Sequence, residues 1–258
     1  LTKSCPPLML RSLPLVNACD ALPRMTVNST PSIAVIVPTF NEQGNIAPVI
    51  EQTIRAFGKT QIRIFFADDS TDGTTEEIKN LMRSYPCVDI QHNATRRGLA
   101  QAVVDALNEV TEDIVIVMDG DLQHPPAIAP RLVAAINEGA DFAVASRYTV
   151  GGHELGLSNR WRQLASWGAS RLAQTLLPAA RKTTDPLSGF FACRRVLIAK
   201  SRLQPVGFKI LLECLVRGQG TLVVDVPYTF DRRLRAASKA SIAEGLRFLI
   251  HLLRLHRS

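Results

Sequence analysis

Several signatures of common protein classes are missing from this chain of 258 residues. No apolar run approaches the roughly 18 residues that a membrane-spanning helix needs. No G-x-G-x-x-G follows the first predicted strand and no G-x-x-x-x-G-K-S/T occurs, which argues against a dehydrogenase and a P-loop nucleotidase. The five cysteines are odd in number, widely spaced and without a C-x-x-C pair, which predicts reduced thiols rather than disulfides or a zinc site.

The two ends of the chain differ in composition from its middle. Residues 1–30 begin with Leu1 and hold four prolines without a continuous apolar core, so we expect a poorly ordered extension and no cleaved signal peptide. Residues 231–258 hold seven Arg or Lys against two acidic residues, so most of the net charge of +7 falls there. This basic segment indicates an anionic partner, which is a phosphate, a membrane surface or nucleic acid.

Strand and helix patterns alternate through the first half of the chain. The strands are short apolar or β-branched runs at Ile33–Val37, Ile62–Ala67, Val88–His92, Ile114–Met118 and Asp141–Ser146. Helical spacing of apolar residues separates them, at Asn45–Phe57, Thr75–Ser84, Gly98–Leu107 and Ala127–Asn137. This alternation predicts an α/β fold with a doubly wound, mainly parallel sheet flanked by helices.

Polar residues follow four of these strands, at Thr39–Glu42, Asp68–Asp72, Asp119–Gln123 and Arg147. In doubly wound sheets ligands bind beyond the carboxyl ends of the strands, so these residues are candidates for one shared site. Turn and cap chemistry is the ordinary alternative, because Asp, Ser and Gly favour both. Taken separately, Ser70 and Asp72 fit helix caps better than ligands.

The run VIVMDGDLQHPP at 115–126 is the most informative stretch for a metal site. Carboxylates beside a buried strand are costly unless a cation compensates them. The oxygens of Asp119, Asp121 and Gln123 suit a hard ion such as Mg²⁺ or Mn²⁺, which would in turn hold a diphosphate. By itself an Asp-x-Asp pair is more often a solvated strand end. His124 fits a packing residue better than a ligand of a hard metal.

The second half departs from regular alternation. Ser158–Leu177 has the pattern of a long helix. Asp185–Phe191 and Gly207–Glu213 combine aromatic, glycine and charged residues, as a pocket wall does. Core segments that contain a turn fit those two stretches equally well.

The last helix pattern, Ser241–Leu255, is amphipathic. Its apolar positions recur at helical spacing: Ile242, Leu246, Leu249, Ile250 and Leu253, with Leu252 and Leu255 widening the face. Arg247, His251 and Arg254 fall along another face. An interfacial helix on anionic lipid fits this pattern, and so does a final helix packed on the protein's own core.

The order of these segments resembles the dolichyl- or polyprenyl-phosphate mannose synthases, which are inverting GT-A glycosyltransferases of family two. The resemblance covers about Ile33 to Leu255. Its most specific markers are MDGDLQHPP (118–126), DPLSGFFACRR (185–195) and GFKILLE (207–213). Weaker markers are VPTFNE (37–42), DDSTDGT (68–74), RGLAQA (97–102), ASRY (145–148) and VPYTF (226–230) leading to Ser238–Lys239.

The resemblance implies roles for individual residues. It implies that the nucleotide base and ribose are contacted by Pro38, Glu42 and Asp68. It implies that the metal, Mg²⁺ or Mn²⁺, is bound by Asp119, Asp121 and Gln123. It also implies that the phosphates of donor and acceptor are surrounded by Arg147, Arg162, Ser166, Arg233 and Lys239. Among all of these, the residues expected to act in catalysis are Asp121, Arg147, Arg233 and Lys239.

The implied reaction moves mannose from GDP-mannose to dolichyl or polyprenyl phosphate. A polyprenyl-phosphate glucosyltransferase that uses UDP-glucose would share almost every motif and stays open as an alternative. A nucleic-acid-binding module would leave the acidic strand ends unexplained, so we expect no nucleic-acid partner. We expect peripheral binding at the cytoplasmic face of a membrane, with an extension at 1–30, a GT-A domain at 31–240 and an interfacial helix at 241–258.

Overall fold

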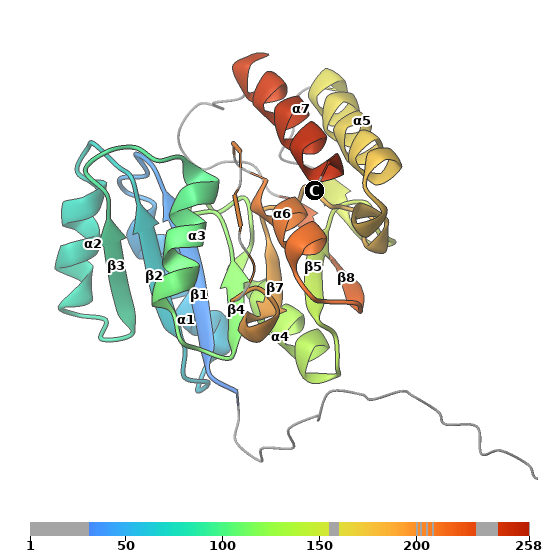
Figure 1. Cartoon of the computed structure of the whole chain (residues 1–258). Helices are drawn as coiled ribbons and strands as arrows, with labels where there is room; N and C mark the ends of the chain where they lie inside the picture. Colours follow the sequence, from blue (N-terminus) through green and yellow to red (C-terminus); the bar gives the residue numbers. More distant parts are fainter. Residues whose placement is uncertain are drawn as a thin grey trace, which may run out of the picture. The chain divides into compact units, whose positions relative to one another are not determined.

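The computed structural model describes residues 31–154, 160–199, 201, 203–204, 206–207, 209–230 and 242–257. The unit Pro31–Ser258 is built on a seven-stranded sheet with the order β3-β2-β1-β4-β7-β5-β8 (Figure 1). The extension expected at 1–30, the loop that carries Arg233 and Lys239, and the cysteines Cys5 and Cys19 lie outside the described residues. The three described cysteines are free thiols.

The first half of the sheet is parallel, as predicted. β1 (Ile33–Thr39) pairs with β2 (Arg63–Asp68) on one side and with β4 (Ile114–Val117) on the other, and β2 pairs with β3 (Val88–His92). All seven residues of β1 are buried, because helices cover both faces of the sheet. The prediction of a doubly wound, mainly parallel sheet is therefore confirmed.

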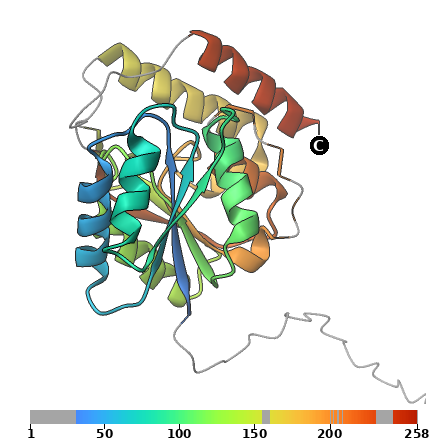
Figure 2. The same cartoon turned by 90° about the vertical axis from the view of Figure 1, so that its left-hand side faces the viewer.

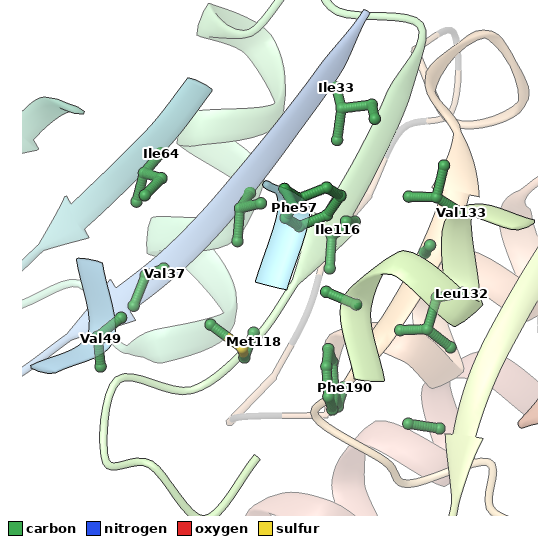
Figure 3. Packing of buried hydrophobic residues seen from close by; sticks show 14 of the residues in the cluster. Ile33, Val37, Val49, Phe57, Ile64, Ile116, Met118, Leu132, Val133 and Phe190 are labelled. Carbon is green, nitrogen blue, oxygen red and sulfur yellow. The ribbon is translucent and has the colours of Figure 1, made fainter. Parts of the chain in front are cut away.

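The two layers of helices explain why the strands are apolar on both sides. The helices α1 (Ile46–Phe57), α2 (Thr74–Met82) and α4 (Ala129–Asn137) pack on the face that holds Ile33, Val35 and Val37. Figure 3 shows Phe57 of α1 and Val133 of α4 on this face. On the opposite face α3 (Leu99–Glu109) and α6 (Ile210–Arg217) cover Ala34 and Ile36. Figure 2 shows α1 and α3 on opposite sides of the sheet.

The strands after β5 were not predicted, and β7 is the one that shapes the site. β7 (Phe191–Arg194) runs antiparallel between β4 and β5 (Phe142–Ser146), and Phe191 lies opposite Val117. The sheet then ends with β8 (Val223–Pro227), which is parallel to β5. Because β7 begins beside the last residue of β4, the segment 185–190 that precedes it arrives next to Asp119.

Small elements complete this end of the fold. β6 (His153–Glu154) pairs with β9 (Thr229–Phe230), and this short ladder holds Phe230 beside the end of β5. In the described ranges, 3₁₀ helices connect larger elements at η1 (Pro126–Ile128), η2 (Pro178–Lys182) and η3 (Arg195–Leu197).

Two long helices lie side by side above the second half of the sheet, α5 (Arg160–Leu176) and α7 (Ile242–His256) (Figures 1 and 2). α7 buries Leu252 and Leu255 in a cluster with Leu177, Leu187 and Leu212. The C-terminal helix is thus packed on the rest of the unit. Among the described residues, no helix has the length and hydropathy needed to cross a bilayer.

Candidate active site

A cavity of ≈ 700 Å³ opens at the carboxyl ends of the strands. Four strands supply its walls through residues at or just after their carboxyl ends, which are Pro38 to Phe40 and Glu42 at β1, Asp69 at β2, Asp119 to Asp121 and Gln123 at β4, and Arg147 at β5. The polar strand ends therefore form one site, as the sequence indicated, and are not four unrelated turns.

The segment after β4 is a tight loop that is held by a hydrogen bond within it and by packing on β1. The backbone N–H of Gln123 donates to Oδ1 of Asp121 at 3.0 Å. Between them Leu122 has φ 61°, a left-handed conformation that a buried leucine adopts only where its surroundings impose it. At Gly120 an added Cβ would lie 3.2 Å from side-chain carbons of Val37 and Thr39, so the loop packs directly on β1.

His124 anchors the other end of this loop. Its Nδ1 accepts a hydrogen bond from the backbone N–H of Asp119 at 3.1 Å. The ring stacks on Phe190 at 5.3 Å between centroids and lies against Tyr228 and Phe230. Burial lowers the pKa of His124 to about 4, so the ring is neutral and Nδ1 is available as an acceptor. His124 therefore acts on Asp119 through the backbone, which agrees with the prediction of a packing role.

Arg147 is held in place by a buried carboxylate. Its Nε and Nη2 donate to the two oxygens of Asp185 at 2.7 and 3.0 Å, and Asp185 is fully buried. Burial opposes the charge of Arg147, but the Asp185 carboxylate raises the pKa of the guanidinium above its usual value. The guanidinium also lies over the ring of Phe230 at 5.4 Å. A permanent, oriented cation therefore borders the cavity, as an anion site requires.

Lys209 is a second cation of the cavity wall, and the sequence reasoning did not single it out within GFKILLE. Its Nζ donates to the carbonyl oxygen of Leu187 at 2.9 Å. Burial lowers the pKa of Lys209 to about 8, with nearby Arg147 acting in the same direction and Asp185 and Asp119 against it. Lys209 precedes α6 by one residue, and it reaches the cavity because α6 packs against β7 in the fold. The sequence alone did not indicate this packing.

The two acidic residues at the end of β2, Asp68 and Asp69, have different surroundings. Asp68, which was predicted to contact the nucleotide, does not line the cavity. It is fully buried and accepts hydrogen bonds from Ser70, Thr75, Thr39 and His92 at 2.5 to 2.9 Å. Burial alone would raise the pKa of this carboxyl, but these hydrogen bonds hold it below its usual value. Asp68 therefore fastens the end of β2 to its neighbours, and the cavity receives Asp69.

Asp69 in turn positions the loop before α3. Its Oδ2 accepts hydrogen bonds from the backbone N–H groups of Arg97 and Gly98 at 2.8 and 2.9 Å. That loop brings Arg96 over the ring of Phe40 at 4.0 Å, and both side chains line the cavity. The pair Phe40–Arg96 is a flat, cationic surface beside Pro38, which the sequence reasoning did not identify.

The other predicted phosphate ligands are only partly described. Ser166 lies on α5, and its hydroxyl shares a hydrogen bond of 3.0 Å with the hydroxyl of Tyr148. Arg162 belongs to α5, but its side chain lies outside what the structure describes, as do Arg233 and Lys239. The roles predicted for these residues stay predictions.

Comparison with known proteins identifies the family. The family model described as "Glycosyl transferase family 2" matches residues 34–201. A dolichol-phosphate mannosyltransferase of Mycosarcoma maydis is 34% identical over 247 residues, which are 90% of this chain and 81% of that protein. The chain belongs to the dolichol-phosphate mannosyltransferases of glycosyl transferase family 2. The family and the enzyme class predicted from the sequence are confirmed.

Two further relatives bear on this family assignment and on the fold. A dolichol-phosphate mannosyltransferase of Pyrococcus furiosus is 38% identical over 227 residues, which are 86% of this chain but only 63% of that protein. A crystal structure of glucosyl-3-phosphoglycerate synthase from Mycobacterium tuberculosis, in complex with Mn²⁺, UDP-glucose and phosphoglyceric acid, has a TM-score of 0.64 and 22% identity, covering 88% of this chain and 80% of that one. The latter likeness supports the GT-A-like fold.

The oxygen atoms that line the cavity fit a hard divalent ion whose remaining ligands come from substrate and water. Within the described part of the chain, no three His, Cys, Asp or Glu side chains gather to hold a metal by themselves. Asp119, Asp121 and Gln123 all line the cavity and offer oxygen atoms. Mg²⁺ and Mn²⁺ accept such a partial shell, because water and phosphate oxygens supply the remaining ligands.

Proposed function

We propose that this chain transfers mannose from GDP-mannose to the phosphate of a dolichyl or other polyprenyl lipid. The observation that carries the proposal is that Asp119, Asp121 and Gln123 line the same cavity as the cations Arg147 and Lys209. Carboxylates and cations in one cavity suit a metal-bound nucleoside diphosphate facing an anionic acceptor. The names of the relatives at 31–38% identity supply the sugar and the lipid.

A divalent ion, Mg²⁺ or Mn²⁺, is part of the proposal, with Asp119, Asp121 and Gln123 as its ligands. Such an ion neutralises the charge that develops on a departing diphosphate. The chain holds this loop in place before any ligand binds. Nδ1 of His124 accepts the backbone N–H of Asp119, and the left-handed Leu122 lets the backbone N–H of Gln123 donate to Oδ1 of Asp121. Little reorganisation is then needed when substrate arrives.

The reaction needs no dedicated general base. A phosphate monoester has a second pKa near 6 and is largely ionised at neutral pH. Its oxygen forms a bond to the anomeric carbon of the sugar while the bond from that carbon to the diphosphate oxygen breaks, with inversion of configuration. The residues of the chain therefore bind and orient: Arg147, fixed by Asp185, faces phosphate oxygens, and Lys209 adds a second positive charge.

We assign the nucleotide to the β1 and β2 side of the cavity. Pro38 and Glu42 line that side, and the Phe40–Arg96 surface offers an aromatic ring and a cation against which a base can stack. Asp69 takes the place we had expected for Asp68. Arg162, Ser166, Arg233 and Lys239 remain our candidates for the phosphates of donor and acceptor, with Arg233 and Lys239 on a loop that closes over the substrates.

A membrane surface is the remaining partner. The phosphate of a membrane lipid must reach the cavity, and α5 and α7 expose apolar side chains to solvent, among them Trp167, Leu249 and Leu253. We propose peripheral attachment at the cytoplasmic face through these two helices.

The test is an assay of purified protein with a short polyprenyl phosphate and either GDP-mannose or UDP-glucose, with products identified by mass spectrometry. We expect polyprenyl-phosphate mannose from GDP-mannose in the presence of Mg²⁺ or Mn²⁺, and little product from UDP-glucose. Preferred transfer of glucose would move the chain to the glucosyltransferase alternative. Transfer to another acceptor in place of the lipid phosphate would overturn the proposal.

A further inference from the structure

Arg247 stands apart from the other residues of the cavity wall. It lines the cavity together with the strand-end residues, yet it belongs to α7, 100 positions after Arg147, the predicted phosphate ligand at the end of β5. The sequence pattern had grouped Arg247 with His251 and Arg254 as a cationic face of an interfacial helix. In the folded chain these three side chains have different surroundings.

A buried polar contact fixes the rotation of α7. Nε2 of His251 lies 2.7 Å from Oε2 of Glu213 on α6, and both side chains are buried. Nδ1 of His251 has no hydrogen-bond partner among the described residues, so Glu213 is the polar contact that orients the ring there. Arg247 precedes His251 by one helical turn on the same side of α7, so this contact also sets where Arg247 lies.

Glu213 connects α7 to the cavity by a second route. Its Oε1 accepts a hydrogen bond from the backbone N–H of Gln204 at 2.8 Å and pairs with Nε of Arg217 at 2.6 Å. Val206 and Gly207, just after Gln204, line the cavity, and so does Lys209 before α6. One buried carboxylate therefore holds both the segment that leads to Lys209 and the helix that carries Arg247.

The placement of α7 indicates which anion Arg247 meets. α7 packs beside α5 over the β5 and β8 side of the sheet, whereas Pro38 and Asp69 end β1 and β2 on the other side (Figure 1). The turn of α7 that follows Arg247 exposes Leu249, Ile250 and Leu253. Arg247 thus lines the cavity from a helix that also exposes apolar residues, and this helix packs over the β5 and β8 side of the sheet. This placement suits an anion that belongs to a lipid.

We propose that Arg247 binds the phosphate of the polyprenyl acceptor, and that the Glu213–His251 contact is the positioning device that keeps it at the cavity. The inference rests on the proposed function, because it takes its acceptor from there. It makes α7 a substrate-binding element as well as a surface helix. The guanidinium suits this task because it stays charged and offers paired donors to phosphate oxygens.

The first experiment uses a short, soluble polyprenyl phosphate, so that membrane binding plays no part. Arg247→Ala is expected to raise the KM for this acceptor about ten- to a hundredfold, the range of one hydrogen-bonded charge contact. The KM for the nucleotide sugar should stay unchanged, and Arg247→Lys should recover part of the loss. The matched control is Arg254→Ala, because Arg254 is exposed two turns further along the same flank of α7 and does not line the cavity.

Calorimetry of the same acceptor with protein that holds GDP and Mg²⁺ separates this inference from the proposed function. Wild type that binds no polyprenyl phosphate would refute the proposed acceptor. Wild type that binds, with Arg247→Ala binding equally well, would refute the role of Arg247 alone. A variant whose loss falls on the KM for the nucleotide sugar would show that Arg247 serves the donor, which also overturns the inference.

The positioning role of His251 is tested by two substitutions. His251→Leu fills similar volume but removes the contact with Glu213, whereas the side-chain amide of His251→Gln still donates to it. We expect His251→Leu to raise the acceptor KM as Arg247→Ala does, and His251→Gln to restore it. A His251→Leu variant that melts at lower temperature but keeps the wild-type acceptor KM would show a purely structural contact. If His251→Leu does not fold, His251→Gln with a raised acceptor KM and an unchanged melting temperature contradicts the geometry proposed here.

Discussion

At the scale of single residues, the site depends on carboxylates that the fold holds beside a buried strand. Asp121 follows β4, is almost fully buried, and accepts the backbone N–H of Gln123. Such a residue contributes little to the apolar core, so its removal should separate activity from stability. This makes Asp121 the sharpest point at which to test the proposed metal.

Asp121→Ala is expected to reduce transfer roughly a hundredfold or more, since a bound metal supplies several kcal/mol of charge stabilisation in the transition state. The melting temperature should change by only a few degrees, the shift that about 1 kcal/mol produces in a domain of this size. A chelator should abolish wild-type activity, and added Mn²⁺ or Mg²⁺ should restore it. Full activity in excess chelator would refute metal dependence.

Lys209 gives a prediction for the dependence of activity on pH. Burial lowers the pKa of its ammonium group to about 8, so the group loses its positive charge as the pH rises through that value. We therefore expect kcat/KM, which reports the ionisation of the free enzyme, to fall above about pH 8. Lys209→Met should show lower activity at pH 7 and no such alkaline limb. An unchanged limb in Lys209→Met would assign it to another group.

The sequence located most of these residues but could not orient them. Pro38, Glu42, Asp119, Asp121, Gln123 and Arg147 line the cavity as their strand-end positions indicated. Asp68 and Asp69 are neighbours at one strand end, and successive side chains of a strand point to opposite sides. Sequence alone does not reveal which of the two is buried, because that depends on Ser70, Thr75 and His92, which meet Asp68 only in the fold.

At the scale of elements, six helices were predictable, whereas α6 and β7 were not. Each of the six predicted helices has apolar residues at helical spacing, which is a local property, but α6 begins within a stretch that was interpreted as a pocket wall. The four residues of β7 carry no such periodicity, and its antiparallel place between β4 and β5 comes from tertiary pairing. This unpredicted strand nevertheless shapes the site, because Phe190 at its entry lies under the ring of His124.

Phe190 therefore links core packing to the loop that carries the metal ligands. Phe190→Ala removes a fully buried ring and should lower the free energy of unfolding by about 3–5 kcal/mol, measured by urea denaturation. It should also weaken the binding of Mn²⁺ together with GDP, because His124 loses its stacking partner. Phe190→Leu is the matched control, with a smaller cavity and a smaller effect on both. Unchanged ion binding in a folded Phe190→Ala would separate β7 from the site.

At the scale of the whole molecule, the C-terminal helix α7 has features of both interpretations that the sequence left open, a helix packed on the core and an interfacial helix. One side of α7 buries Leu252 and Leu255, so the helix does pack on the protein's own core. The other side exposes Leu249, Ile250 and Leu253 by 45%, 39% and 52%, and the helix α5 packed beside it exposes Leu164 and Trp167. Arg171 lies over the ring of Trp167, which adds a cation to this apolar surface. A surface with both properties suits the boundary of an anionic bilayer.

Replacing Leu249, Ile250 and Leu253 together by Ser should weaken co-sedimentation with anionic vesicles about a hundredfold, since each half-exposed side chain contributes roughly 1 kcal/mol of apolar burial. Transfer to a soluble acceptor should be retained, because these residues do not line the cavity. The control is Leu222→Ser, which is equally exposed at 52% but precedes β8, at the end of the sheet opposite the cavity. Vesicle binding that survives the triple substitution would assign the membrane contact to another part of the chain. Loss in the control as well would mean that binding follows overall hydrophobicity rather than this pair of helices.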